Sequence, residues 1–299
     1  MKLGKLGVWA SLDGMTAADA LAFARRTERR GYLTLWTPES RGRNVLVNAA
    51  WLLAGTSSLI VATGIANIYA RDAVAMANAQ RGLNEQAGNR FLLGLGVSHR
   101  PLVSDMRGHV YGSPVSTMRS YLKAMRAAPY QAPAPSEPPR TVLAALGPKM
   151  LALSAEMTDG AHPYCVTPEH TAQARGILGA GRLLCPELMV LLETDPAKAR
   201  AAARAALASY IQLENYANNW RRLGFTEEDL AGGGSNRFVD ANVAWGDESA
   251  IRARIQLFWD AGADHVCIQS IHPSGSRTTL DERIFDLLAP AAGLMAQGD

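Results

Sequence analysis

The sequence predicts an α/β protein of the closed (β/α)8 TIM-barrel class with inserted loops, because one pattern recurs along almost the whole chain. A short apolar run ends in a few polar or small residues, and an amphipathic helical stretch follows. The eight runs are residues 3–9, 33–36, 59–65, 91–97, 141–146, 160–164, 188–193 and 265–269. Strands that alternate with helices form parallel βαβ units, and about eight units over roughly 250 residues is what such a barrel needs.

A single domain spanning residues 1–299 is the second expectation. No Ser/Gly linker or charge block divides the chain. The proline-rich residues 128–139 lie between a helix and the fifth apolar run, and the glycine-rich residues 232–235 lie inside the seventh crossover. We therefore interpret both stretches as loops of one barrel.

Composition narrows the class of function. An apolar fraction of 48% and a charged fraction of 19% are ordinary for a globular enzyme with a large core. The net charge of +3 comes with dispersed basic residues, which gives no reason to expect a nucleic-acid partner. The three cysteines lack metal-site spacing and suit a reduced cytosol. No apolar run approaches the roughly 18 residues of a membrane span, so we expect a cytoplasmic protein with a small-molecule substrate and no membrane partner.

Local signals predict several helix boundaries. Thr16 is a suitable N-cap for a first helix over residues 17–30, and Asp195 and Asp247 are suitable N-caps for two later helices. Each later helix carries an apolar stripe, one of which includes Tyr210. We expect these stripes to be core and assign them no chemistry.

Candidate catalytic residues follow the apolar runs, because the active site of a barrel lies where strands end and βα loops begin. Glu39 follows the second run, where a carboxylate could orient a substrate or move a proton. The alternative is a structural pairing of Glu39 with Arg41 or Arg71. The third run leads into Asn67, Tyr69 and Arg71, which are expected to surround the mouth or, alternatively, only to close a loop.

The fourth run contains two glycines and is followed by Ser98 and His99. A dinucleotide-binding GxGxxG motif would need glycine where His99 stands, so that interpretation fails. Gly94 and Gly96 instead predict a strand that a flat ligand or another backbone approaches closely. His99 is the best placed of the six histidines to hydrogen-bond or shuttle a proton, although a purely structural role remains the alternative.

Two expected helix starts at the mouth are candidate phosphate sites. Thr167 followed by Pro168 begins one helix after the sixth run, and residues 147–149 begin another beside the cation of Lys149. Many such helix starts carry no ligand. The chain has no HExxH, nucleophile elbow, Walker loop or metal-ligand cluster, so a metal is not expected and an organic cofactor is.

At these same loops the chain resembles the luciferase-like monooxygenase superfamily, and more closely its coenzyme F420-dependent oxidoreductases. The matching stretches are "LWTPES", "VATGIANIYARDAVAMANA", "NRFLLGLGVSH", "AALGPKMLALSAEMTDGAHPY" and "VAWGDESAIRARIQLFWDAGADHVCIQ". They span most of the chain in the family's order. The resemblance implies a flavin-type ring across the strand ends, phosphate held by the loop of residues 164–167, and a non-prolyl cis peptide, which maps to Gly64–Ile65.

The expected cofactor site combines the resemblance with the loop positions. Its residues are Gly64, Ile65, Ala66, Gly96, Ser98, Gly147, Lys149, Tyr164, Cys165, Val166 and Thr167. Two departures from the family pattern stand out. Several deazaflavin enzymes carry an Asp-His pair where this chain has Glu39 and Ser40. The usual proton-handling group is therefore absent, and His99 becomes the stronger candidate for that role. The proline often found after the strand-three Asn is Ile68 here.

The function expected is hydride transfer between F420 and a small organic substrate, with Glu39, Asn67 and His99 orienting the reacting group or exchanging its proton. The alternative is an FMN-dependent monooxygenase on the same fold. A non-catalytic ligand-binding barrel is a further alternative, which the retained glycines and polar mouth residues disfavour.

Two further expectations concern charge and assembly. The acidic tail of F420 should meet cations at the mouth, and the candidates are Lys149, Arg100, Arg107 and Arg175. A homodimer is expected because helices near residues 48–54 and 74–84 carry more apolar and small residues than a solvated face should. Family members commonly dimerise through this region.

Overall fold

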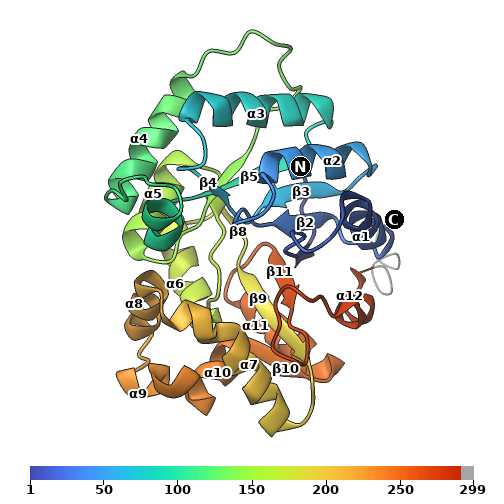
Figure 1. Ribbon diagram of the computed structural model, residues 1–299, viewed down its shortest axis with the longest axis vertical. Helices are drawn as coiled ribbons and strands as arrows, with labels where there is room; N and C mark the ends of the chain where they lie inside the picture. The colour runs from blue at the N-terminus through green and yellow to red at the C-terminus, as the bar shows by residue number, and fades with distance from the viewer. Residues whose placement is uncertain (291–299) are drawn as a thin grey trace.

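The computed structural model describes residues 1–290, in which parallel strands form a curled sheet enclosed by helices (Figure 1). The strands are β1 (Leu6–Trp9), β2 (Thr34–Thr37), β3 (Ile60–Thr63), β4 (Ala66–Asn67), β5 (Phe91–Gly96), β6 (Thr141–Leu143), β7 (Gly160–Ala161), β8 (Leu183–Leu184), β9 (Glu187–Leu192), β10 (Val243–Gly246) and β11 (Val266–Ser270). Neighbouring strands follow the order β11-β1-β2-β3-β5-β6-β7-β8, and β9 lies on the other side of β11. All ten strand pairings within this part of the chain are parallel, as βαβ units require.

The sheet closes because β8 and β9 are two parts of one extended segment. Cys185 N donates to Ala161 O at 2.9 Å and Glu187 N donates to Pro163 O at 2.9 Å, which ties this segment to β7. Cys267 N donates to Pro186 O at 3.0 Å, which ties it to β11 on the other side. The predicted barrel is therefore confirmed.

The helices that cover the barrel are α1 (Ala17–Arg29), α2 (Val45–Ala54), α3 (Ala73–Gln86), α4 (Pro114–Ala127), α5 (Pro148–Met157), α6 (Pro168–Leu178), α11 (Glu248–Asp260) and α12 (Glu282–Leu287). Local signals set their starts as expected. The side chain of Thr16 accepts from Asp19 N, Asp195 accepts from Ala197 N, and Asp247 accepts from Ala250 N.

A long insertion follows β9 and forms a hydrophobic cluster of its own. It contains α7 (Pro196–Ile211), α8 (Glu214–Arg222), α9 (Glu227–Leu230) and α10 (Asn236–Asn242), which Figure 1 shows gathered at one end of the molecule. Leu207, Trp220 and Phe238 are fully buried between these helices. The insertion ends in β10, a four-residue strand that the sequence did not predict. Within the described residues β10 lies at the edge of the sheet and pairs with β9 alone. Its apolar run is short and lies outside the regular alternation of strands and helices from which the barrel strands were predicted.

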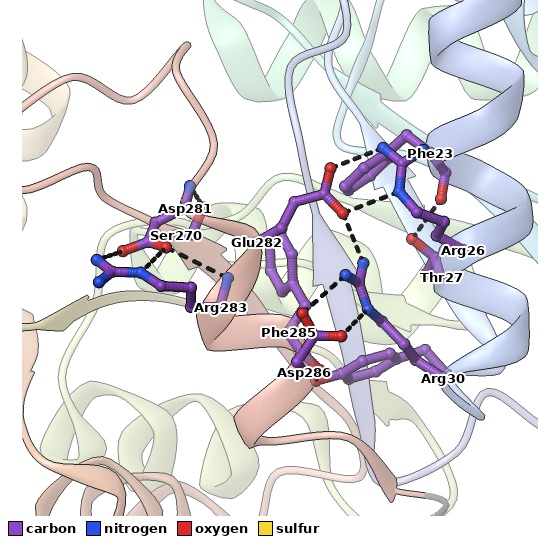
Figure 2. Close-up of polar contacts among 11 residues, drawn as sticks. Phe23, Arg26, Thr27, Arg30, Ser270, Asp281, Glu282, Arg283, Phe285 and Asp286 are labelled. Carbon is purple, nitrogen blue, oxygen red and sulfur yellow. Dashed lines mark hydrogen bonds and ion pairs between the residues drawn. The ribbon is translucent and has the colours of Figure 1, made fainter.

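The first and last helices of the described chain are clamped together at the barrel wall. Figure 2 shows Arg30, the C-cap of α1, forming two hydrogen bonds to Asp286 of α12, at 2.7 and 3.0 Å, and a third to Glu282 at 2.9 Å. Arg26 binds Glu282 through two more, at 2.7 and 3.0 Å. Planar guanidinium groups that meet carboxylates edge to edge fix orientation as well as charge.

The third barrel strand is interrupted in the way the sequence predicted. β3 ends at Thr63 and pairing resumes at β4, and the peptide bond between Gly64 and Ile65 is cis. The expectation of a cis or sharply bulged Gly64–Ile65 peptide is confirmed. Within residues 1–290, no helix is long and apolar enough to cross a membrane.

Candidate active site

A cavity of about 950 Å3 opens at the carboxyl ends of the barrel strands. Trp9 at the end of β1, Gly64 and Ile65 after β3, Gly96 of β5, and Gln269 of β11 all line it. Its size is at the upper end of what small-molecule and cofactor pockets occupy. The cavity lies where the active site of a barrel is expected.

The floor of the cavity is formed by backbone at the cis bend. Trp9 Nε1 donates to Gly64 O at 3.2 Å, and a Cβ atom at position 64 would lie 2.6 Å from that nitrogen. A Cβ atom at Gly96 would lie 2.5 Å from Cδ1 of Ile65. Glycine is therefore required at position 64, where a Cβ would collide with the rigid indole of Trp9, and favoured at position 96, where a Cβ would displace the end of the Ile65 side chain. The result is a low surface suited to a flat ring.

His162 lies beneath this floor and is held neutral. Its ring stacks on Trp36 with centroids 4.3 Å apart, and Nδ1 is 2.7 Å from the carbonyl oxygen of Cys185. Burial lowers the pKa of His162 to about 4. Because Nδ1–H donates to Cys185, Nε2 is a bare acceptor, and in residues 1–290 it has no hydrogen-bond partner. His162 lines the cavity, and the sequence analysis did not identify it.

His99 stands on the cavity wall as expected. Burial lowers its pKa, although a hydrogen bond with the side chain of Asn215 opposes the shift, so the imidazole is neutral at pH 7. The ring of Tyr216 lies 5.7 Å away, centroid to centroid. Ser98 precedes it with a φ of +56°, and Ser98 O accepts from the Tyr111 hydroxyl at 3.1 Å. A neutral imidazole here is able to accept or donate one proton.

Glu39 lines the cavity but its carboxylate is committed to other groups. It forms an ion pair with Arg71, and Oε2 accepts from Asn67 N at 2.9 Å. The side chains of Glu39 and Arg71 are only 4% and 10% exposed. The arrangement matches the structural alternative, because the pair and the amide fix the loop after β4 against the loop after β2.

A wall of tyrosines closes the cavity on the side of the α7–α8 insertion. Tyr164 donates to Gln269 Oε1 at 2.7 Å and lies 2.7 Å from the hydroxyl of Tyr210. The rings of Tyr210 and Tyr216 are 5.0 Å apart in an edge-to-face contact. Tyr210 was expected to be core. It instead lines the cavity, because the stripe of α7 that packs inward at its start reaches the cavity mouth at its end.

Positive charge collects where α5 begins. Gly147 is the N-cap of α5, Lys149 lies in its first turn, and both line the cavity together with Arg222 from the end of α8. The Arg222 Nη2 lies 3.5 Å from where a Cβ of Gly147 would stand. A helix N-terminus with two cations is a favourable site for a phosphate.

Several predicted residues lie elsewhere. Asn67 is 2% exposed, accepts from Tyr69 N at 2.9 Å and does not line the cavity. Four other buried residues of the expected cofactor site also do not line the cavity, and these are Ala66, Cys165, Val166 and Thr167. Of the expected phosphate loop only Tyr164 reaches the cavity, because Cys165 turns back, with a φ of +56°, and its N–H donates to Glu187.

The expected tail-binding cations divide in the same way. Lys149 lines the cavity and Arg100 lies over the ring of Tyr111, which also lines it. Arg107 lines a smaller pocket of about 220 Å3 beside Arg41. The placement of Arg175 at the mouth was wrong. Its side chain binds Asp264 and the carbonyl of Gly262, since it lies in the last turn of α6, at the opposite end of that helix.

The sequence analysis missed Trp9, His162, Gln269, Arg222 and Arg277, all of which line the cavity. Arg277 and Gln269 belong to the end of the last apolar run and its loop, so the rule that identified Glu39 and His99 would also have found them. Arg222 comes from a helix of the insertion, and nothing in the local pattern marks it.

Comparison with known proteins identifies the family. The luciferase-like monooxygenase model matches residues 2–265. A Mycobacterium tuberculosis (strain ATCC 25618 / H37Rv) protein named as a coenzyme F420-dependent oxidoreductase is 28% identical in an alignment that covers 76% of this chain and 79% of that one.

Solved structures share the fold. The coenzyme F420-dependent tetrahydromethanopterin reductase from Methanopyrus kandleri has a TM-score of 0.71 at 14% identity, covering 97% of this chain and 98% of that one. An FMN-bound Baeyer–Villiger monooxygenase component from Pseudomonas putida has a TM-score of 0.66 at 13% identity, covering 95% and 96%. The solved structures show the shared fold, and the match to the family model over residues 2–265 shows that the chain belongs to the luciferase-like monooxygenase family.

Proposed function

We propose that this protein is an oxidoreductase that transfers hydride between coenzyme F420 and a small organic substrate. The observation that carries the proposal is the glycine-lined cavity floor at Gly64 and Gly96, where added side-chain atoms would collide with Trp9 and Ile65. The relative from Mycobacterium tuberculosis supports F420 as the cofactor, and the Methanopyrus kandleri structure shares the fold. A fold of this kind also binds FMN in other proteins, so the choice between the two needs a direct measurement.

The residues present fit such a cofactor. Gly64, Ile65 and Gly96 would support the ring from below, with the bare Nε2 acceptor of His162 under the same floor. The N-terminus of α5 with Lys149 and Arg222 would hold the phosphate, in place of the loop at residues 164–167. When bound, F420 supplies hydride carriage at its ring.

The chain's own groups supply position and protons. Tyr164, Tyr210 and Tyr216 close one side of the cavity and limit the access of water. His99 is the imidazole on the cavity wall, and in its neutral form a ring nitrogen can give a proton to, or take one from, the reacting group of the substrate. The Glu39–Arg71 ion pair holds in place the loop that carries Ser40 and Arg41, and so fixes the position of these two cavity-lining residues.

The proposal is tested by titrating purified protein with F420 and with FMN at low and high salt, following the fluorescence of each cofactor. We expect micromolar or tighter F420 binding that weakens with salt, because the acidic tail of F420 beyond its phosphate meets exposed cations. Lys149→Gln and Arg222→Gln should each weaken binding by about 0.2–1 kcal/mol. Arg29→Gln removes the same charge from an exposed position on α1 and should change nothing. Tight FMN binding with no F420 binding would instead support the monooxygenase.

A further inference from the structure

Arg277 is a fixed cation in the wall of the cavity. It lies in the loop that follows β11, and its guanidinium carbon is 4.3 Å from the centroid of the Tyr210 ring. Its Nη2 donates to Ser209 Oγ at 2.9 Å. Arg277, Tyr210 and Ser209 all line the cavity. Stacking and neutral hydrogen bonds to the Ser209 and Tyr164 side chains hold the guanidinium in position and leave others of its five N–H donors for another group.

No counter-ion accompanies this charge. Among residues 1–290, no carboxylate forms an ion pair with Arg277. Glu187 is the fully buried acid that interacts with Arg277 through space, but burial raises the pKa of Glu187 to about 8. The carboxyl is therefore protonated at neutral pH, and the charge of Arg277 faces the cavity uncompensated.

The groups around Arg277 are hydrogen-bond donors. The Oε1 of Gln269 accepts from the Tyr164 hydroxyl, so its amide nitrogen is the end left over, and within the described residues that nitrogen has no partner. Burial raises the pKa of Tyr210 to about 12, so its hydroxyl stays protonated. Because Tyr164 gives its own proton to Gln269, the Tyr210 hydroxyl donates to the Tyr164 oxygen, so one guanidinium edge and one amide are the donors that match the two acceptor oxygens of a carboxylate.

This end of the cavity is distinct from the α5 end. Tyr216, near the start of α8, packs 5.0 Å from Tyr210, whereas Arg222 at the last position of α8 reaches Gly147. A helix rises 1.5 Å per residue, so Tyr216 and Arg222 are about 9 Å apart along the axis of α8. One anionic group at each end would therefore not compete for the same cations.

We propose that Arg277, held by stacking on Tyr210, binds together with Gln269 the carboxylate of an anionic organic substrate. The inference rests on the proposed function, because it assigns the α5 end of the cavity to the cofactor phosphate. The Tyr164 ring lies 5.3 Å from the Trp9 ring, and Trp9 in turn donates to Gly64. The rings of Tyr164 and Trp9 thus lie between the carboxylate site and Gly64, and the substrate is a small acid whose reducible group reaches toward Gly64.

The test uses matched acids and amides as probe ligands. Benzoate, phenylacetate and cinnamate, with their carboxamides, are titrated calorimetrically into the cofactor-free protein at constant ionic strength. F420 is titrated separately into the same samples. Arg277→Gln is compared with Arg277→Lys, which keeps the charge but not the planar edge, and with Arg29→Gln as a control on exposed charge. Thermal unfolding of each variant verifies that it is folded.

We expect at least one acid to bind more tightly than its amide, and Arg277→Gln to weaken that acid by about 10- to 100-fold. Arg277→Lys should recover part of the loss, and F420 binding should change less than about twofold in both variants. Acids that bind no better than amides, or an unaffected Arg277→Gln variant, would overturn the carboxylate site. Parallel loss of F420 would assign Arg277 to the cofactor and overturn it as well. Failure of F420 to bind while the acid discrimination persists would remove the proposed function alone.

Discussion

Trp9 and Gly64 are joined by a hydrogen bond from the indole nitrogen to the carbonyl oxygen, 3.2 Å long, that connects the end of β1 to the cis bend after β3. The bond makes the indole part of the cavity floor. It also explains why position 64 accepts only glycine, since the same nitrogen lies 2.6 Å from where a Cβ would stand. The shape of the cofactor surface is therefore set by two residues that are 55 positions apart.

Gly64→Ala should weaken cofactor binding by at least about tenfold while leaving the protein folded, because the added methyl group displaces Trp9 and His162 from the floor. Fluorescence titration with F420 measures the effect. Gly176→Ala is the matched control. Position 176 lies within α6 with nothing inside 4 Å of the new Cβ, so this variant should bind normally and gain about 0.5–1 kcal/mol of stability. Normal binding by Gly64→Ala would show that no ring rests on the bend.

Glu39→Gln should cost stability more than it costs chemistry. The change leaves the Arg71 guanidinium buried without its counter-ion, which lowers the free energy of unfolding by about 3–5 kcal/mol. The double variant Glu39→Gln, Arg71→Gln should recover part of that loss. Glu156→Gln, in an exposed pair with Arg119, should leave urea unfolding nearly unchanged. A stable but inactive Glu39→Gln enzyme would restore the catalytic role first expected of Glu39.

Stability should be greatest near pH 6.5. Burial lowers the pKa of both His162 and His265 to about 4, so below 6.5 the unfolded chain binds more protons and stability falls with the pH. His265 is locked neutral because its Nε2 accepts from the Trp36 indole at 3.0 Å. Burial raises the pKa of Glu187 from 4.5 to about 8, and this carboxyl acts in the opposite sense.

Above pH 6.5 only the effect of Glu187 remains of these three, because the folded protein keeps a proton that the unfolded chain has lost. Stability should then fall by about 1.4 kcal/mol per pH unit up to pH 8. Urea unfolding of wild type and Glu187→Gln from pH 5 to 8 measures the loss of stability on both sides of pH 6.5. The variant should lose the alkaline decline, and Glu248→Gln, an exposed carboxyl of α11, should retain it. An unchanged decline in Glu187→Gln would refute the assignment.

A homodimer through α2 and α3 is proposed on their exposed apolar side chains. Val47 is 69% exposed, Trp51 47% and Val74 41%. Such a group is more apolar than a solvated surface requires. Val47→Glu should shift light-scattering mass toward the monomer, whereas Leu257→Glu, an exposed apolar residue on α11, should leave the dimer intact. A wild-type monomer at every concentration would contradict the proposal.

Local signals were enough to predict the scaffold, because caps such as Thr16 and Asp247 and the periodic apolar runs act within a few residues of one another. The cis bend came from the family resemblance, since nothing in Gly64–Ile65 alone requires it. The position of Thr167 was not predictable in this way. It caps α6 as expected, yet whether a capped helix start faces a cavity depends on the turn at Cys165, which tertiary contact with Glu187 sets.

Side chains that reach the cavity from the α7–α10 insertion were even harder to predict from the sequence. Tyr210 continues an apolar stripe, and only the packing of α7 against α8, α10 and β10 decides that its ring faces the cavity. Arg222 and Arg175 are both arginines in the last turns of helices, but one turns toward Gly147 and the other toward Asp264. The difference comes from which end of the barrel each helix ends at, which depends on long-range packing.

The clamp between α1 and α12 has a consequence for synthesis. Arg30 leaves the ribosome early, but Glu282 follows 252 residues later. Until then the apolar face of α1, including Phe23, has no α12 side chain such as Phe285 to pack against, although the two rings finish 5.9 Å apart. At about 5–20 residues per second, translation of these residues would leave the apolar face of α1 uncovered by α12 for roughly 10–50 seconds. During that interval a chaperone, or the same apolar face of another nascent chain, can contact α1.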